Sequence, residues 1–454
     1  MTAKYDIAVI GGGPGGYTAA IKAAQLGARV ILFEQNSVGG TCLNVGCIPT
    51  KYLLEKAGFL EKIKNDTQEG ILKDAGMFSW SRIKKQKDDV IIKLTRDVTG
   101  ILKKHNITIV TGRARFDTPN IVSCGDYDYK AEHVIIATGS KASVPPISGI
   151  ANNKHVLDST MALEITRVPK SLVVIGGGAI GLEFASIFHA FGTDVTILEM
   201  LPEIIATEDR EISNFLQYSL KTKGINIFTD VIVKEMIKDD LCKILFEHEG
   251  QEKSVISENI LLATGRSPSL DGISAKNLAL NDQGYICVDE GMRTSLKDVY
   301  AIGDVTGGIQ LAHAAYAQAE VAAINCIGGD AQVNLTIMPR CVYSLPQMAA
   351  VGETEERLEA NSVDYVKSTL PYAANGKAVA SNETTGMVKI LATKNEERIL
   401  GVHMAGANAS ELISGAIVAM NSKLTVSDFK QMIFPHPTMS EMLSEAILAI
   451  HGKE

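Results

Sequence analysis

Cys42 and Cys47 lie five positions apart, and thiols at such a spacing could carry redox chemistry. In an ideal helix this spacing separates the two Cα atoms by about 7.5 Å of rise, because each residue rises about 1.5 Å. A disulfide tolerates Cα atoms no more than about 7 Å apart. Pairing therefore requires a bend between them, which Gly46 could supply most easily. The spacing alone leaves two unrelated thiols, or half of a metal site, equally open.

His436 is the second residue whose setting suggests chemistry. Pro435 and Pro437 flank it and restrict the backbone, which would hold the imidazole in one orientation. A base that titrates near neutral pH can deprotonate a thiol. Thr438 and Glu441 also have the spacing of a helix capping box, so a purely structural role for this segment is an alternative.

A glycine-rich turn near the N-terminus would position the first reactive segment. An apolar run at 5–10 leads into glycines at 11–16, an alanine-rich stretch at 17–26 and a second apolar run at 28–33 that ends in Glu34. This order predicts strand, turn, helix, strand and acidic residue. The glycines would let the helix N-terminus approach a pyrophosphate, and the carboxylate could accept hydrogen bonds from a ribose.

The same pattern recurs in the middle of the chain. An apolar run at 172–175 leads into a glycine turn at 176–181, an apolar helix at 182–191 and a strand at 194–198 that ends in Glu199. A carboxylate at this place favours an unphosphorylated ribose, since a 2′-phosphate would be repelled. The second site is therefore expected to bind NAD rather than NADP.

Further spacing supports two related modules. Gly13 precedes Glu34 by 21 positions, and Gly178 precedes Glu199 by 21 positions. Two short apolar runs, at 134–139 and 260–265, both end in Ala-Thr-Gly and are expected to be the last strand of each module. A flavin could carry electrons between a nicotinamide and a dithiol, which do not exchange a hydride directly.

The composition indicates a globular protein with several domains. At 454 residues the chain exceeds one ordinary core, so roughly two to four domains are expected. A net charge of −8 argues against nucleic acid as a partner. Seven cysteines, mostly scattered, fit a reducing compartment in which a disulfide is catalytic. A strand from Tyr5 leaves no room for a targeting peptide, and no apolar run reaches membrane-spanning length, so a cytoplasmic location without membrane attachment is expected.

The expected fold is α/β, with two Rossmann-like dinucleotide-binding domains and a C-terminal α+β domain. The strands expected within 388–404 and the helices expected at 411–420 and 441–450 define that last domain. The expected boundaries are 1–148, completed by 269–335, for the first domain, 149–268 for the second and 336–454 for the third.

Three motifs resemble the flavin-dependent pyridine nucleotide–disulfide oxidoreductases. The segment 39–51, Gly-Gly-Thr-Cys-Leu-Asn-Val-Gly-Cys-Ile-Pro-Thr-Lys, is similar to the redox-active segment of that family. The segment 294–304, which ends in Gly-Asp, is similar to its second flavin motif. The segment 436–441, His-Pro-Thr-Met-Ser-Glu, is similar to its C-terminal active-site motif. The resemblance extends from about residue 5 to residue 450.

The resemblance implies a role for each matched position. Cys42 would exchange with substrate sulfur, Cys47 would lie against the flavin, and Lys51, paired with Glu183, would approach the flavin. His436 would be the acid/base, oriented by Glu441. In a homodimer with shared active sites, it would face Cys42 of the other chain. One non-covalent FAD per subunit would contact Gly11, Gly13, Gly16, Glu34, Thr41, Lys51, Ala114, Thr138, Gly139, Asp304 and Ala312. NAD would contact Gly176, Gly178, Gly181, Glu199, Val231 and Gly265. No metal site is expected.

Within the family, the chain most resembles the members that reoxidise dihydrolipoyl groups on carrier proteins with NAD. No cysteine follows Cys341, which disfavours members with an extra C-terminal redox pair. Apolar residues around His436 suit a thin, uncharged lipoamide arm. The expected partners are lipoyl carriers of 2-oxoacid dehydrogenase or glycine cleavage systems. The alternatives are an NADH-dependent reductase of another small disulfide, an NADH oxidase or diaphorase, and a flavoprotein that acts as a scaffold.

Overall fold

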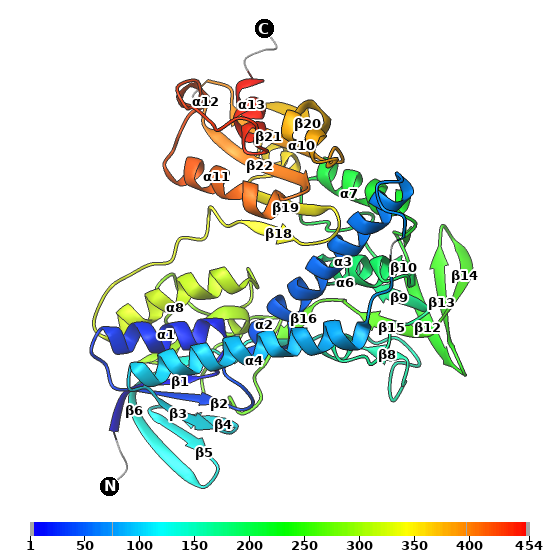
Figure 1. Cartoon of the computed structure of the whole chain (residues 1–454). Helices are drawn as coiled ribbons and strands as arrows, with labels where there is room; N and C mark the ends of the chain where they lie inside the picture. The colour runs from blue at the N-terminus through cyan, green and yellow to red at the C-terminus, as the bar shows by residue number, and fades with distance from the viewer. Residues whose placement is uncertain (1–3, 75, 396, 451–454) are drawn as a thin grey trace. The chain divides into compact units, whose positions relative to one another are not determined.

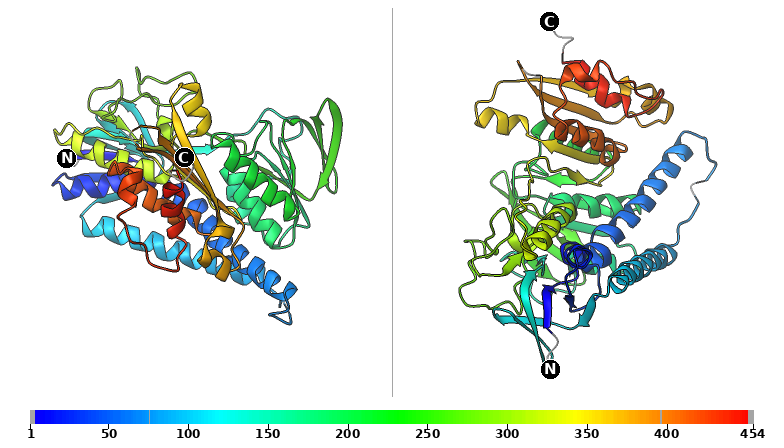
Figure 2. Two further views of the ribbon diagram at one scale, coloured as in Figure 1. Left: turned by 90° about the horizontal axis from the view of Figure 1, so that it is seen from above. Right: turned by 90° about the vertical axis from the view of Figure 1, so that its left-hand side faces the viewer.

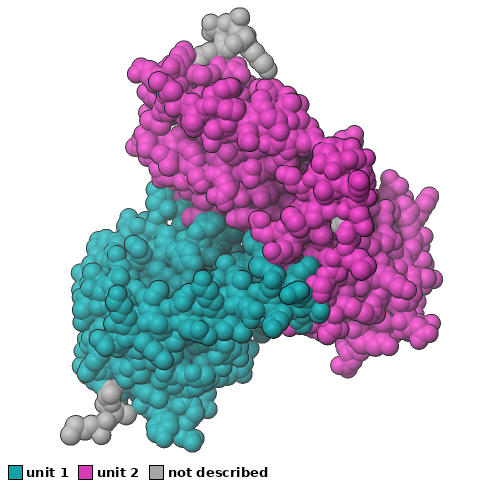
Figure 3. All heavy atoms as spheres, in the orientation of Figure 1, with its two compact units in different colours: residues 1–52, 81–143, 265–335 teal, residues 53–80, 144–264, 336–454 magenta. Residues whose placement is uncertain are grey.

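The computed structural model describes residues 4–74, 76–395 and 397–450. These residues form two compact units, shown in two colours in Figure 3. The first unit comprises residues up to 52, 81–143 and 265–335, and the second comprises 53–80, 144–264 and residues from 336 onward. The three-domain boundaries expected from the sequence stay a prediction. Among the described residues, no helix is long and apolar enough to cross a membrane.

The first unit is built on a mixed sheet with the strand order β3-β2-β1-β6-β5-β4, in which β17 also pairs with β6. Its strands are β1 (Lys4–Ile10), β2 (Val30–Glu34), β3 (Thr108–Thr111), β4 (Ala114–Thr118), β5 (Ile121–Cys124), β6 (Tyr127–Ile136) and β17 (Val299–Ala301). β2 is buried over its whole length, and it pairs in parallel with β1, as the apolar run predicts. A separate ribbon consists of β7 (Ser140–Ala142) and β16 (Arg266–Pro268).

Helices follow the expected glycine turns of this unit. α1 (Pro14–Gln25) packs against α8 (Ala312–Cys326), as Figure 1 shows. The other helices are α2 (Gly40–Val45), α3 (Cys47–Gln68), α4 (Trp80–Lys104) and the 3₁₀ turn η1 (Gly303–Thr306), of which α3 and α4 extend into the second unit. The strand–turn–helix–strand order predicted for the N-terminal module is confirmed.

The second unit contains a parallel sheet with the order β11-β10-β9-β15-β8. Its strands are β8 (Val156–Leu157), β9 (Ser171–Ile175), β10 (Asp194–Leu198), β11 (Asn226–Phe228) and β15 (Asn259–Leu262). α6 (Ala179–Ala190) packs on β9 and β10. The remaining elements are α5 (Ser159–Leu163), α7 (Arg210–Thr222) and the antiparallel β12 (Ile232–Lys238), β13 (Cys242–His248) and β14 (Gln251–Ser257). The second predicted module is therefore also confirmed.

The C-terminal part of the second unit is an antiparallel sheet with the order β18-β19-β22-β21-β20. Its strands are β18 (Arg340–Val342), β19 (Gln347–Gly352), β20 (Tyr365–Pro371), β21 (Met387–Thr393) and β22 (Ile399–Gly406). α11 (Ala409–Asn421) packs on β19 and β22, and α13 (Glu441–Leu448) packs on β20 and β21 (Figure 2). The shorter helices are α9 (Glu355–Ala360), η2 (Tyr372–Ala374), α10 (Gly376–Ala380) and α12 (Val426–Phe429). The predicted α/β fold class with a C-terminal α+β part is confirmed.

Candidate active site

Of the predicted cofactor positions Gly11, Gly13 and Gly16 in the first glycine turn, only Gly13 has open space beside it. A Cβ on Gly11 would lie 2.3 Å from the carbonyl oxygen of Ala137, and one on Gly16 would lie 1.8 Å from that of Gly11. These two glycines are therefore required by the protein's own packing. A Cβ on Gly13 would meet only the Cα of Gly40, at 3.9 Å. The space beside Gly13, at the start of α1, fits a pyrophosphate that approaches the helix N-terminus.

The second glycine turn repeats this arrangement. A Cβ on Gly176 would lie 2.4 Å from the carbonyl oxygen of Ala263, and one on Gly181 would lie 2.0 Å from that of Gly176. Within the described residues, no atom lies within 4 Å of a Cβ built on Gly178. The start of α6 thus offers the same open cradle as the start of α1.

The acidic residue after each second strand is fixed by its own turn. Glu34 Oε2 accepts a hydrogen bond from the backbone N–H of Gly12 (2.7 Å), and Glu199 Oε2 accepts one from that of Gly177. In both, Oε1 accepts from the backbone N–H two positions further on, at 2.8 Å and 2.7 Å. Each carboxylate oxygen retains a second lone pair. Both carboxylates can therefore accept hydrogen bonds from ribose hydroxyls.

Other positions expected to contact the flavin lie around the first turn. The hydroxyl oxygen of Thr138 is buried and has no hydrogen-bond partner among the residues that the structure describes, which fits a polar atom that bonds to a cofactor. Asp304, on η1, accepts a hydrogen bond from the hydroxyl of Ser140, and the Nε of Arg266 lies 3.7 Å from its Oδ2. These features fit a polar group bound beside the turn.

The remaining predicted cofactor positions lie at the ends of elements. Ala114 is buried at the start of β4, and Ala312 is the first residue of α8. Val231 is buried, and its N–H donates to the carbonyl oxygen of Glu199 (2.9 Å). Gly139 and Gly265 both have left-handed backbones, with φ of +70° and +108°, which explains glycine at these positions.

The two cysteines of the motif lie together at a break between two helices. Gly46 separates α2 from α3, and a Cβ there would lie 2.9 Å from the carbonyl oxygen of Thr41, so the bend favours glycine. The side chains of Cys42 and Cys47 are hydrogen-bonded to each other. Their hydrogen bond raises the pKa of the Cys42 thiol, and burial raises it further, whereas the charge of Lys51 opposes the shift. The break at Gly46 therefore brings the two sulfur atoms into contact.

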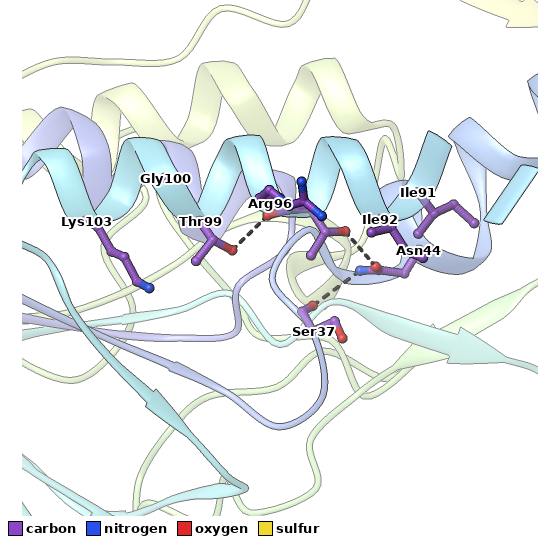
Figure 4. A pocket seen from close by; sticks show the side chains of 9 residues that line it. Ser37, Asn44, Ile91, Ile92, Arg96, Thr99, Gly100 and Lys103 are labelled. Atoms are coloured by element: carbon purple, nitrogen blue, oxygen red, sulfur yellow. Dashed lines mark hydrogen bonds between the residues drawn. The ribbon is translucent and has the colours of Figure 1, made fainter. Parts of the chain in front are cut away.

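Asn44 is a structural residue of this segment that sequence reasoning missed. Its Nδ2 donates to the carbonyl oxygens of Ser37 (3.3 Å), Val38 (3.2 Å) and Gly40 (3.0 Å), and its Oδ1 accepts from the hydroxyl of Thr95 on α4 (3.1 Å). Figure 4 shows the bond to Ser37 beside α4, at an open pocket of about 500 Å³. Asn44 thus fixes the helix that carries Cys42. In the sequence, the only sign of this role was the position of Asn44 within the segment 39–51.

His436 is oriented by Glu441. Its Nδ1 lies 3.0 Å from Glu441 Oε1, while Oε2 accepts from the N–H of Thr438 (2.8 Å). The Thr438 bond, and then the His436 bond, lower the pKa of Glu441. With the proton on Nδ1, the neutral ring presents Nε2 as a base. The His436 side chain is 79% exposed.

Only one of the two hydrogen bonds of a capping box forms between Thr438 and Glu441. Glu441 accepts from the Thr438 backbone, but the Thr438 hydroxyl donates to the carbonyl oxygen of Pro435 (2.8 Å). α13 begins at Glu441, and the side chain of its N-cap residue Ser440 makes no capping hydrogen bond within the described chain. The segment therefore fixes the imidazole and does not form the complete box.

The structure also places Glu183, Lys51 and Thr41, the three remaining predicted residues. Glu183 is buried on α6, and its Oε1 accepts from the backbone N–H of Tyr343 (3.1 Å). Lys51 lies on α3, about one turn after Cys47. The pairing of Lys51 with Glu183 stays a prediction. Thr41 lies in the first turn of α2 and is exposed.

Comparison with protein families extends over nearly the whole chain. Residues 5–319 match the model for pyridine nucleotide-disulphide oxidoreductases, and residues 338–447 match the dimerisation domain of the same family. The chain belongs to this family. Its members use FAD and NAD(H), and the open glycine turns fit both. The dimerisation domain supports a homodimer.

Similar proteins are found among curated sequences and solved structures. The chain is 37% identical to a dihydrolipoyl dehydrogenase of Bacillus subtilis, over 100% of this chain and 99% of that protein. It is also 37% identical to one of Geobacillus stearothermophilus, over 96% and 94%. A Cu(II) complex of the HOCl-induced flavoprotein disulfide reductase RclA from Escherichia coli matches with a TM-score of 0.89 and 30% identity, over 98% of this chain and 99% of that one.

Proposed function

We propose that the chain is an FAD-containing dihydrolipoyl dehydrogenase that reoxidises protein-bound dihydrolipoamide to lipoamide with NAD. The overall reaction converts dihydrolipoamide and NAD⁺ to lipoamide, NADH and a proton. Full-length similarity to dihydrolipoyl dehydrogenases supports the substrate. The partners proposed with it are lipoyl carriers of 2-oxoacid dehydrogenase or glycine cleavage systems, in the cytoplasm.

The contact between Cys42 and Cys47 carries this proposal, because adjacent thiols can cycle between dithiol and disulfide. In the oxidised form, a substrate thiolate attacks Cys42 Sγ. A mixed disulfide forms, the Cys42–Cys47 bond breaks, and Cys47 leaves as a thiolate. The second substrate thiolate then attacks the substrate sulfur bound to Cys42. Lipoamide closes, and Cys42 leaves with the electron pair of the broken bond.

His436 is proposed to accept the protons of the substrate thiols. The hydrogen bond to Glu441 directs Nδ1 inward, so Nε2 is presented to the substrate. The carboxylate also stabilises the imidazolium that forms. We place His436 of one protomer opposite Cys42 of its partner. Its high exposure in the single chain is consistent with a site that a second chain completes.

The cofactors are proposed to occupy the two glycine turns. The Gly13 cradle and Glu34 would hold the pyrophosphate and ribose of FAD, with Asp304 at its polar chain, and the Gly178 cradle and Glu199 would hold NAD. Bound FAD supplies the two-electron carrier between the dithiol and NAD. Lys51 and Glu183 are proposed to pair near it.

Anaerobic titration of the FAD-loaded protein with dihydrolipoamide tests the function. One equivalent of dihydrolipoamide should reduce the Cys42–Cys47 disulfide and produce a long-wavelength band from the Cys47 thiolate beside the flavin, and addition of NAD⁺ should remove this band. Cys42→Ser should abolish reduction by the dithiol. Cys287→Ser, at an exposed cysteine outside the motif, should leave it unchanged. An unchanged titration in Cys42→Ser would contradict the role of the pair. NADH oxidation with oxygen or a quinone as acceptor that is unchanged in Cys42→Ser would favour an NADH oxidase or diaphorase.

A second candidate is an NADH-dependent reductase of another disulfide. The structural likeness to the RclA disulfide reductase favours it. Both candidates use Cys42 and Cys47, so the cysteine variants do not distinguish them. Comparison of kcat/KM for lipoamide with that for other small disulfides, with NADH as donor, does. A lower value for lipoamide than for another disulfide would favour this candidate.

A further inference from the structure

The segment between β10 and α7 covers one side of the second glycine turn. Both backbone polar groups of Gly177 are hydrogen-bonded to this segment. The N–H donates to the Glu199 carboxylate, and the carbonyl oxygen accepts from the N–H of Ile205 (2.9 Å). The Cγ2 of Ile204, which is fully buried, lies 2.9 Å from the place that a Cβ on Gly177 would occupy. The position of this segment, 199–209, therefore sets the shape of the turn.

The first module makes the same return contact with a different residue. There, the carbonyl oxygen of Gly12 accepts from the N–H of Gly39 (2.8 Å), and Gly39 has φ of +107°. Glycine adopts such a backbone without steric cost. Ile205 has φ of +40°, which is strained for a β-branched residue. Such strain persists only where surrounding contacts hold it.

Two cations of the C-terminal sheet hold the end of this segment. The carbonyl oxygen of Ile205 accepts from the N–H of Glu208 (2.8 Å). The Nε of Arg340, on β18, donates to both carboxylate oxygens of Glu208, at 2.8 Å and 3.0 Å. The Nζ of Lys389, on β21, donates to Oδ1 of Asp209 (2.9 Å). The side chains of Lys389 and Asp209 are 1% and 0% exposed.

Lys389 is also anchored on its other side. Its Nζ lies 2.5 Å from Oε2 of Glu355, on α9, and 3.1 Å from Oε2 of Glu211. The other Asp209 oxygen accepts from the N–H of Glu355 (3.2 Å). A buried ammonium with this many partners is a firm anchor, because its removal leaves buried carboxylates unpaired.

We propose that Lys389, with Arg340, is a positioning residue for NAD binding. Through Asp209 and Glu208 it fixes segment 199–209 against Gly177, and so keeps the cradle at Gly178 open and Glu199 in place. The proposal rests on the NAD site proposed above.

Lys389→Met is the main test, with Lys367→Met as its matched control. Lys367 donates to the same Glu355 carboxylate (2.6 Å) but is half exposed. In the FAD-loaded protein, Lys389→Met should speed amide hydrogen exchange in 200–209 and raise the Kd for NAD⁺, measured by calorimetry, by about tenfold. Lys367→Met should leave both unchanged. Lys389→Arg, which keeps the charge, should restore part of the affinity.

The proposal would be overturned if Lys389→Met had the same amide hydrogen exchange rates in 200–209 and the same Kd for NAD⁺ as the wild type. Equal effects of Lys389→Met and Lys367→Met would also overturn it, because they would indicate general loosening around Glu355. A different result addresses the site itself. If Gly178→Ala binds NAD⁺ with wild-type affinity, the proposed NAD site is wrong, whatever exchange in 200–209 shows.

Ile205→Gly keeps the proposal testable if Lys389→Met folds poorly. Glycine adopts φ of +40° without steric cost, so the backbone of this segment should be less strained and should depend less on its contacts with the two cations. Arg340→Gln should then raise the Kd for NAD⁺ by a smaller factor in the Ile205→Gly background than in the wild type. Equal factors in both backgrounds would show that the cation does not act through the strained backbone.

Discussion

At Gly13 and Gly178, a side chain would enter the space proposed for a cofactor without contacting the rest of the protein closely. Both have ordinary helix N-cap backbones, with φ of −73° and −79°. Their neighbours Gly11 and Gly176 have φ above +100° and stand against carbonyl oxygens. Glycines two positions apart in each turn thus serve different purposes. Gly13 and Gly178 leave room for the proposed ligand, and Gly11 and Gly176 provide the backbone geometry.

This difference predicts the outcome of alanine substitution at the second turn. Gly178→Ala should fold with an unchanged melting temperature and bind NAD⁺ at least about tenfold more weakly, because the new methyl group meets only the ligand. Gly176→Ala should lower the melting temperature, since its Cβ would lie 2.4 Å from the carbonyl oxygen of Ala263. Calorimetric binding and thermal unfolding measure both effects. Equal melting temperatures for Gly178→Ala and Gly176→Ala would contradict this distinction.

At the scale of elements, ion pairs connect α9 with β20 and β21. Glu355 on α9 pairs with Lys367 on β20 and with Lys389 on β21. Burial raises the pKa of Glu355, but hydrogen bonds from Lys367 and Lys389 lower it by more, to about 2. The folded pKa thus lies below the ordinary value of 4.5. The stability that this carboxylate contributes is present above pH 4.5 and is lost as the pH falls through about 2.

Acid should therefore unfold the wild type more steeply than Glu355→Gln. At pH 7 the variant should melt at a lower temperature, because Lys389 loses a charged partner. The difference between the two melting temperatures should shrink as the pH is lowered from 4.5 towards 2. Thermal unfolding followed by circular dichroism over this range measures it. A constant difference would show that Glu355 does not titrate in the folded protein as expected.

Local sequence patterns predicted the helices and strands of the two modules well, but they could not predict contacts between residues far apart in the sequence. The glycine spacing and the apolar runs located both modules, because each of these signals lies within one short segment. The buried anchor could not be found in this way. Asp209 and Lys389 are 180 positions apart, and only the packing of α7 against the C-terminal sheet brings them together. The hydrogen bonds of Asn44 likewise depend on how loop 37–40 folds back.

At the scale of the whole molecule, the dithiol and its proposed base lie in different compact units of the chain. Cys42 belongs to the first unit and His436 to the second. The dimerisation domain supports a pair of chains, and the proposed site takes one group from each. Closed two-fold symmetry would then give two equivalent sites per dimer.

Mixed dimers test this arrangement. Cys42→Ser and His436→Ala should each be inactive with dihydrolipoamide as homodimers. After the two are unfolded and refolded together, half of the dimers should be mixed, each with one intact site, so activity should recover to about a quarter of wild type. Refolding each variant alone is the control, measured by NADH formation. No recovery in a mixture shown to contain mixed dimers would mean that each chain uses its own histidine.

The break at Gly46 has a consequence for how fast such a catalyst can turn over. Because the chain is already bent where the sulfurs meet, making and breaking the bond between them requires no helix to melt and reform. The backbone of α2 and α3 can therefore keep its conformation throughout the redox cycle. We expect the rate to depend instead on how fast the proposed dithiol substrate binds and how fast the reduced nucleotide leaves.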